Sequence, residues 1–141
     1  FVFYTNLNSP KSEDIKKNPK AEMCFHWKSL KRQIRIFGKV IKVNDKEADI
    51  YFNSRPYESK IGALASNQSK VLKDTKNFIK KINELKKKYK DKNKVPRPTH
   101  WSGLCLNPTS FEFWLGDDYR VHQRLKYYKV FNNWKRKILY P

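Results

Sequence analysis

Apolar and polar residues alternate along several stretches of the chain, and this pattern predicts a mainly β protein with inserted helices. Alternation with a period of two is typical of strands that bury one face, and we expect such strands at residues 1–5, 21–27, 33–40, 101–106, 110–115, 119–130 and 134–140. Apolar spacings of three and four are typical of helices, which we expect to begin near residues 10, 44, 56 and 74. Together, these strands and helices predict a largely antiparallel sheet curled into a barrel, with the helices inserted midway along the chain.

Capping residues and prolines mark where these helices begin. Asn44 is followed three residues later by Glu47, which is the spacing of a capping box. Pro56 cannot extend that helix without losing a hydrogen bond, so a second helix is expected from Pro56 to about residue 65. The inward face of the helix that begins at Asn44 is expected to consist of Ala48, Tyr51 and Phe52.

The length of the chain bounds its organisation. A chain of 141 residues has room for one domain, which buries roughly two thirds of its unfolded surface, so we expect residues 1–141 to form a single domain. Aromatic residues make up 15% of the chain, enough to offset the entropy of ordering it. No apolar run approaches the ~20 residues of a membrane-spanning helix. Because Phe1 already belongs to a predicted strand and is not methionine, we expect that an N-terminal segment of the domain is missing.

Cysteine, histidine and glycine are sparse. Two cysteines, Cys24 and Cys105, are too few for a disulfide scaffold, so a reducing cytoplasm is the expected location. His26, His100 and His122 are dispersed and no cysteine belongs to a CxxC pair, so we expect no metal site. With four glycines in all, glycine-rich phosphate loops are disfavoured.

The chain is strongly basic. Its 32 Lys and Arg against 13 Asp and Glu give a formal net charge of +19, which attracts phosphate-bearing partners. However, 25 of these cations are Lys and only 7 are Arg. Arg is the residue that recognises nucleic-acid bases and phosphates through pairs of parallel hydrogen bonds. Much of the excess lies between residues 73 and 94, on the outer face of a predicted helix. We therefore favour a solvated lysine-rich surface, with small phosphorylated ligands left open and nucleic acid as the weaker alternative.

One cluster has the chemistry of a phosphate site. Tyr51, Arg55 and Ser59 follow one another at intervals of four across the helix break at Pro56. Two hydroxyls and a guanidinium suit a phosphate monoester, and Ser59 falls in the first turn of a helix, where free N–H groups favour an anion. The alternative is structural: Tyr51 in the core, Arg55 on the surface and Ser59 as a cap.

A second cluster follows the turn at residues 116–118. Arg120, His122 and Arg124 alternate along the predicted strand 119–130, which places all three on one face. Such a face is costly to bury unless an anionic or aromatic ligand covers it; the alternative is an exposed basic strand. Trp114, across the turn, can stack on a planar ring or simply pack.

Several segments together resemble one enzyme family. Residues 54–63 have the sequence SRPYESKIGA and residues 67–69 the sequence NQS, which resemble the SRPxxSxIGAxxSxQS segment of the pyridoxamine 5'-phosphate oxidase family. FYTNL at residues 3–7, RQ at 32–33 before Gly38, FEFW at 111–114, RVHQR at 120–124 and the ending from Trp134 to Pro141 match in order. The resemblance covers essentially the whole chain.

The resemblance implies an FMN-binding split-barrel fold and a homodimer with FMN at its two-fold interface. It implies FMN-dependent oxidation of pyridoxamine 5'-phosphate or pyridoxine 5'-phosphate to pyridoxal 5'-phosphate. Oxygen is the acceptor and yields hydrogen peroxide, and the amine substrate also releases ammonia. This reaction belongs to the biosynthesis and salvage of the vitamin B6 cofactor. No membrane or nucleic-acid partner is implied.

The resemblance also assigns roles to particular residues. It implies FMN contacts at Tyr4, Thr5, Lys11, Gln33, Gln68, Ser69, Trp114 and Arg124. It implies that Tyr51, Arg55 and Ser59 hold the substrate phosphate, in agreement with their spacing. Arg120 and His122 are expected to hold the pyridoxyl ring against the flavin as the catalytic pair. Hydride transfer to a flavin demands placement more than acid–base groups, which suits these residue types.

Two other functions stay open at this point. One is a truncated, inactive remnant that binds flavin or pyridoxal 5'-phosphate without turnover. The other, of a different class, is a basic nucleic-acid-binding module.

Overall fold

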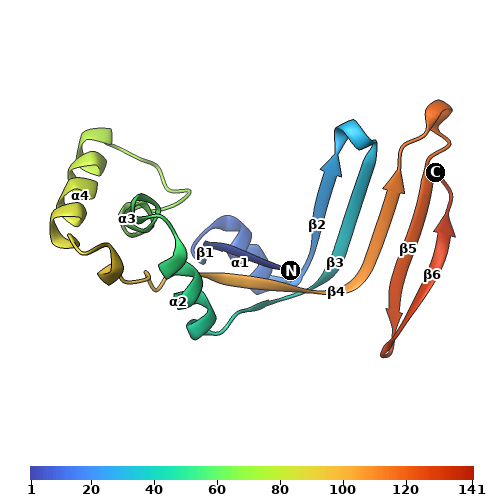
Figure 1. Cartoon of the computed structure of the whole chain (residues 1–141), viewed down its shortest axis with the longest axis horizontal. Coiled ribbons are helices and arrows are strands. Elements are labelled where there is room, and N and C mark those ends of the chain that lie inside the picture. The colour runs from blue at the N-terminus through green and yellow to red at the C-terminus, as the bar shows by residue number, and fades with distance from the viewer. The chain divides into compact units, whose positions relative to one another are not determined.

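The computed structural model describes residues 1–141, which form strands, α-helices and short 3-10 turns (Figure 1). The strands are β1 (Val2–Asn6), β2 (Lys20–Trp27), β3 (Arg32–Lys42), β4 (Trp101–Leu115), β5 (Gln123–Val130) and β6 (Asn133–Leu139). The helices are α1 (Pro10–Lys17), α2 (Asp45–Ser54), α3 (Tyr57–Ala65) and α4 (Thr75–Lys88). The predicted class, mainly β with helices inserted midway, is confirmed.

The chain divides into two units. Unit 1 comprises Phe1 and residues 18–41 and 105–141, and it holds most of the sheet. Unit 2 comprises residues 2–17 and 42–104, and it holds all four α-helices together with β1. The expectation of one domain over residues 1–141 stays a prediction.

The sheet of unit 1 has one apolar and one polar face. Its strand order is β2-β3-β4-β5-β6, and the printed pairings β2–β3, β4–β5 and β5–β6 are antiparallel. Residues directly opposite each other in such a pair share a face. Phe25 lies opposite Ile34, and Phe113 lies opposite Leu125, which in turn lies opposite Ile138. The period-two alternation predicted from the sequence therefore sorts these apolar side chains onto one side.

The β4 strand is longer than expected. Separate strands were predicted at residues 101–106 and 110–115, but the structure has one continuous strand. It runs through Pro108, which lacks the N–H that a ladder needs. Gly38 on β3 permits this continuous strand because it has no Cβ: a Cβ there would lie 2.0 Å from the Asn107 carbonyl oxygen and would clash with it. The Thr109 hydroxyl also donates a 3.3 Å hydrogen bond to the Phe37 carbonyl. A close approach of two backbones therefore keeps the strand running through the proline.

The start of β5 corrects another expectation. A strand was predicted from residue 119, but β5 begins at Gln123, after a 3-10 turn at Asp118–Arg120. Tyr119 and Arg120 have φ angles of 54° and 64°, in the left-handed region that a strand does not allow. The prediction that Arg120, His122 and Arg124 alternate along one strand is therefore wrong, because only Arg124 is in β5.

The helices of unit 2 begin where the capping residues predicted. The Asn44 side-chain oxygen accepts a 2.8 Å hydrogen bond from the Glu47 N–H at the start of α2, and Pro56 directly precedes α3. Asp74 accepts a 2.8 Å bond from the Lys76 N–H at the start of α4. These local signals set the boundaries of three helices independently of the rest of the fold.

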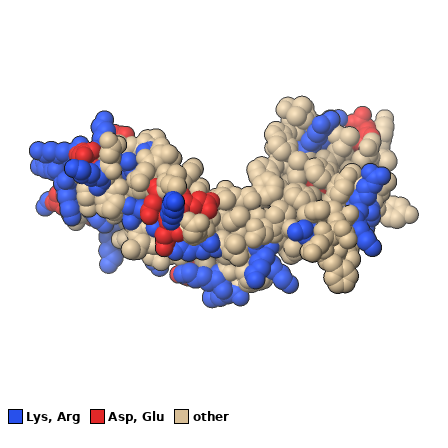
Figure 2. All heavy atoms as spheres, turned by 60° about the horizontal axis from the view of Figure 1, so that its bottom comes forward, with Lys and Arg blue, Asp and Glu red and all other residues tan.

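The core of unit 2 lies between its helices and β4. Its buried members are Phe52, Ile61, Val95 and Trp101. One face of α4 packs against this core, while the other carries the lysines that crowd over α4 (Figure 2, left). The expected inward face of α2 is confirmed for Ala48 and Phe52 but is wrong for Tyr51, which is 45% exposed. No helix in the structure is long and apolar enough to cross a bilayer.

Candidate functional site

Arg55 is an unpaired cation held among aromatic rings. It lies between α2 and α3, with the carbon of its guanidinium 4.9 Å from the centroid of the Trp101 ring and 5.7 Å from that of Phe52. Its Nη1 atom is buried and has no hydrogen-bond partner. Burial lowers the pKa of Arg55 below its usual value, against an opposing effect of Tyr51. A buried donor without an acceptor is costly, so this group is prepared for an anion.

The aromatic side chains near Arg55 form a stack. The rings of Tyr4 and Tyr51 are parallel, with centroids 3.6 Å apart, and the Tyr4 ring lies 5.3 Å from that of Trp101. Burial raises the pKa of Tyr4, with a smaller effect from Glu47. Tyr51 is therefore held by stacking although it is partly exposed. Ser59, the third member of the predicted phosphate cluster, lies half-buried in the first turn of α3.

Two residues predicted to contact a cofactor, Thr5 and Lys11, meet where β1 leads into α1. Lys11 donates a 2.9 Å hydrogen bond from Nζ to the hydroxyl of Thr5, which is buried, and Thr5 follows Tyr4 on β1. The Lys11 ammonium also lies 5.9 Å from the Phe3 ring centroid. An ammonium and a hydroxyl already in contact suit a phosphate or another polar acceptor.

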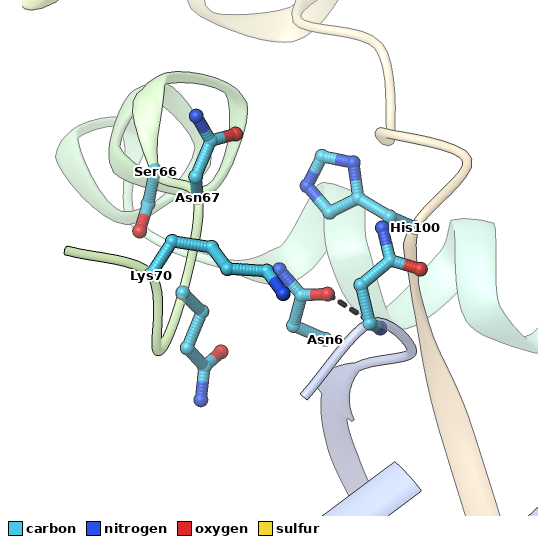
Figure 3. Close-up of a pocket in the computed structure, with 7 residues that line it drawn as sticks. Asn6, Ser66, Asn67, Lys70 and His100 are labelled. Carbon is cyan, nitrogen blue, oxygen red and sulfur yellow. Dashed lines mark hydrogen bonds between the residues drawn. The ribbon is translucent and has the colours of Figure 1, made fainter. Parts of the chain in front are cut away.

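Gln68 lies at a small polar pocket of unit 2. The pocket has a volume of about 170 Å³, and it is lined by Asn6, Asn8, Ser66, Asn67, Gln68, Lys70 and His100. Figure 3 shows Lys70 extending toward Asn6, whose side-chain oxygen accepts a 2.8 Å bond from the Asn8 N–H. Ser69, also predicted to contact the cofactor, follows Gln68 with a left-handed φ of 68°.

Unit 1 holds a much larger cavity with apolar walls. It has a volume of about 960 Å³, and Gln33, Trp114, His122 and Arg124 are among its lining residues. Most of its other walls are apolar side chains of β3 to β6 and of the turn before β3. The Trp114 and His122 rings lie 4.9 Å apart at 51°, and the His122 Nδ1 accepts a 3.2 Å bond from the Asp117 N–H. Arg120 is exposed in the turn and does not line this cavity.

Arg124 is held on two sides. Its Nε and Nη2 donate to the same oxygen of Glu112, at 3.0 and 2.8 Å, and its Nη1 donates to the Tyr140 carbonyl at 3.0 Å. Sequence analysis did not single out Glu112 or Trp101. The signal for Glu112 is that it is the one acid in the FEFW run, directly across the hairpin from basic β5.

The predicted residues therefore fall into two groups. Unit 2 brings Tyr4, Tyr51 and Arg55 together around Trp101. Thr5 and Lys11 form a separate contact, Ser59 follows Arg55 along the chain, and Gln68 lies at the polar pocket. Unit 1 brings together Gln33, Trp114, His122 and Arg124, and leaves Arg120 in an exposed turn. The roles of all these residues stay predictions.

Comparison with known proteins places the chain in a family. Residues 1–89 match the family model described as pyridoxamine 5'-phosphate oxidase, and residues 101–141 match the pyridoxine 5'-phosphate oxidase C-terminal dimerisation region. A pyridoxine/pyridoxamine 5'-phosphate oxidase from Pelagibacter ubique is 58% identical over all of this chain, and one from Hyphomonas neptunium is 46% identical. The chain spans 68% and 65% of these two relatives, about two thirds of their length.

Solved structures agree with this placement. PhzG from Burkholderia lata, in complex with tetrahydrophenazine-1-carboxylic acid, superposes with a TM-score of 0.90 at 28% identity, covering 99% of this chain and 68% of that one. A pyridoxamine 5'-phosphate oxidase-related, FMN-binding protein from Nostoc punctiforme shares the fold, with a TM-score of 0.71 at 16% identity, over 99% of this chain and 72% of its own. The fold is thus of the split-barrel class, as predicted. The chain belongs to the pyridoxamine 5'-phosphate oxidase family.

Proposed function

We propose that this chain is the major part of an FMN-dependent oxidase that converts pyridoxamine 5'-phosphate or pyridoxine 5'-phosphate to pyridoxal 5'-phosphate. Molecular oxygen is the final acceptor and becomes hydrogen peroxide, and the amine substrate releases ammonia. The product is the vitamin B6 cofactor, so the enzyme serves its biosynthesis and salvage. Family membership supports the reaction class. The observation that carries the proposal is the buried, unpartnered Nη1 of Arg55, which the substrate phosphate would satisfy.

The residues present fit FMN. The large cavity of unit 1 combines apolar walls with Gln33, Trp114 and Arg124, a set that suits a flat ring with polar edges. In unit 2, the Thr5 hydroxyl and the Lys11 ammonium, next to Tyr4 on β1, offer donors for polar groups of the cofactor. Gln68 and Ser69 supply further donors and acceptors. When bound, FMN supplies the group that accepts the hydride and passes the electrons to oxygen.

The chain's own residues bind and orient the substrate. Arg55 pairs with the phosphate through Nη1, while the hydroxyls of Tyr51 and Ser59 donate to its remaining oxygens. Because Trp101 and Phe52 fix the guanidinium, little order is lost when the phosphate binds. Arg120 and His122 hold the pyridoxyl ring. The Asp117 N–H already donates to the His122 Nδ1, so the free Nε2 carries the proton in the neutral ring.

A spectroscopic titration tests this proposal. The purified chain loaded with FMN is expected to show a flavin absorption band that bleaches when pyridoxine 5'-phosphate is added without oxygen. Admission of air should restore the band and form hydrogen peroxide. A band that does not bleach although ligand binds would instead support the inactive remnant. Affinity for nucleic acid that falls steeply with salt, without flavin uptake, would support the nucleic-acid-binding module.

We further propose that the enzyme is a cytoplasmic homodimer whose copies meet on the apolar face of unit 1. On this face Ile138 is 84% exposed, and the dimerisation-region match covers β4, β5 and β6, the last of which carries Ile138. Both cysteines are free, which is consistent with a reducing compartment. A second copy is the occupant that the family match favours for so large an apolar surface.

The substitution Ile138→Lys is expected to shift the protein toward monomer, because it places a charge at a largely exposed position of this apolar face. Sedimentation velocity over a range of concentrations measures the shift. Lys137→Ala is the matched control, since Lys137 is the neighbouring residue on the opposite face of β6. Unchanged sedimentation for Ile138→Lys would rule out this face as the interface.

A further inference from the structure

A row of alternating charges crosses four neighbouring strands on the polar face of unit 1. Glu22 on β2 binds Arg35 on β3 through both of its carboxylate oxygens. The Arg35 guanidinium reaches toward Glu112 on β4, with Nη1 4.0 Å from its Oε1. The same Oε1 accepts two hydrogen bonds from Arg124 on β5. Glu112 therefore lies between two guanidiniums, and Arg124 ends the row beside the large cavity.

The central pair of this row is shielded from water. The side chain of Glu112 is only 12% exposed and that of Arg124 28%, whereas Glu22 and Arg35 at the other end are 33% and 43% exposed. Exposed ion pairs contribute little because water and salt screen them, but hydrogen bonds between charged groups grow stronger as water is excluded. The Glu112–Arg124 contact is therefore the one that can hold a side chain in a single orientation.

The hydrogen bonds of Arg124 leave two of its N–H groups free. A guanidinium has five N–H groups. Nε–H and one N–H of Nη2 are used by Glu112, and one N–H of Nη1 is used by the Tyr140 carbonyl. One N–H on each of Nη1 and Nη2 thus has no protein partner. This pair is held in a plane fixed by Glu112, and it belongs to a residue that lines the cavity.

We propose that Glu112 is a positioning residue, which fixes Arg124 so that its two remaining N–H groups are presented to FMN. The inference rests on the proposed function and concerns how the cofactor is held. Arginine has many rotamers, and an arginine free to move would lose that freedom each time the cofactor binds. A carboxylate that orients it in advance removes this cost. Glu112 itself does not need to contact the cofactor.

The test compares Glu112→Ala with Glu22→Ala in the purified chain. Both variants remove one carboxylate from the row, but only the first removes hydrogen bonds of Arg124. Two quantities are measured: the dissociation constant of FMN, by quenching of its fluorescence on binding, and the thermal unfolding midpoint without FMN. Glu112→Ala is expected to raise the dissociation constant about ten-fold, the scale seen when carboxylates that orient metal ligands are removed. Glu22→Ala is expected to leave it within about two-fold of the parent.

A conservative variant separates orientation from general stability. Glu112→Gln keeps an oxygen where Arg124 donates, so it should recover part of the FMN affinity. If Glu112→Ala does not fold, Glu112→Gln and Glu22→Gln are compared in the same way. The proposal would be overturned if the variants at Glu112 and Glu22 bound FMN with equal affinity. It would also be overturned if the loss of FMN affinity were fully explained by a lower unfolding midpoint. A parent protein that does not take up FMN would instead contradict the proposed function.

Discussion

The substitution Arg55→Met is expected to remove most of the enzyme's affinity for the substrate phosphate without lowering the stability of unit 2. Truncating one member of a desolvated charge pair costs about 2–5 kcal/mol, or roughly 30-fold or more in affinity. Methionine keeps the length of the side chain and its contact with the aromatic rings of Trp101 and Phe52. The guanidinium, in contrast, now has a buried Nη1 without a partner, so its loss removes a cost from the folded state.

The measurement is the Michaelis constant for pyridoxine 5'-phosphate beside that for pyridoxine, which lacks the phosphate. In the parent enzyme the Michaelis constant for pyridoxine 5'-phosphate should be much lower than that for pyridoxine. In Arg55→Met the two Michaelis constants should converge. Arg97→Met is the matched control, because each nitrogen of the Arg97 guanidinium already has a protein partner: Nε donates to Asp49 at 2.5 Å, Nη2 to Asp45 at 3.1 Å and Nη1 to the Trp101 carbonyl at 2.8 Å. That variant should lower the unfolding midpoint. The same loss of stability in Arg55→Met, with the preference for the phosphate retained, would contradict the assignment.

The sequence predicted those parts of the fold that depend on neighbouring residues. The start of α2 follows from Asn44 and Glu47, and the break between α2 and α3 follows from Pro56, since both signals act within one turn of helix. The strands of unit 1 were predicted because their apolar residues recur at every second position. Each of these features depends on contacts only a few residues apart.

The parts that were mispredicted depend on contacts that spacing does not encode. Gly116-Asp117-Asp118 suggested a tight turn into a strand, but the Asp117 carboxylate accepts from the Asp118 N–H and the Asp117 N–H donates to His122. These bonds stabilise a longer turn, in which Tyr119 and Arg120 adopt φ angles that their residue types rarely favour. Likewise, nothing near Pro108 indicated that Gly38 lies beside it and lets β4 continue.

In the candidate site, too, features that depend on neighbouring residues were predicted, whereas those that depend on distant contacts were not. The spacing of Tyr51, Arg55 and Ser59 pointed to an anion, because Tyr51 and Ser59 lie on two consecutive helices and Arg55 lies between them. The Arg55 guanidinium, whose Nη1 is buried and unpaired, packs on Trp101, which comes from a distant strand and could not be paired with Arg55 from the sequence. The hold of Glu112 on Arg124 depends in the same way on the register of β4 with β5. Spacing therefore found residues that are proposed to bind the ligand, and it missed those that contact and orient them.

The largest effect on stability is expected from Phe52→Ala. The Phe52 side chain is fully buried and packs edge-on against the Trp101 ring, with centroids 5.1 Å apart. Replacement of a buried phenylalanine by alanine costs about 3–5 kcal/mol, since transfer energy is lost and a cavity is left that the neighbours only partly fill. Urea denaturation followed by tryptophan fluorescence measures the change, which should appear as a lower midpoint with an unchanged slope.

This variant also connects the core to the site. Phe52 is one of the two rings beside the Arg55 guanidinium, so its removal should loosen Arg55 and weaken phosphate binding even under conditions where the protein stays folded. Ile50→Ala is the matched control on the same helix, because the Ile50 side chain is largely exposed and should change the free energy of unfolding by less than about 0.5 kcal/mol. If Phe52→Ala lowered stability as expected but left the phosphate affinity intact, Trp101 alone would suffice to hold Arg55. A loss of stability no larger than that of Ile50→Ala would show that the helices of unit 2 do not depend on this packing.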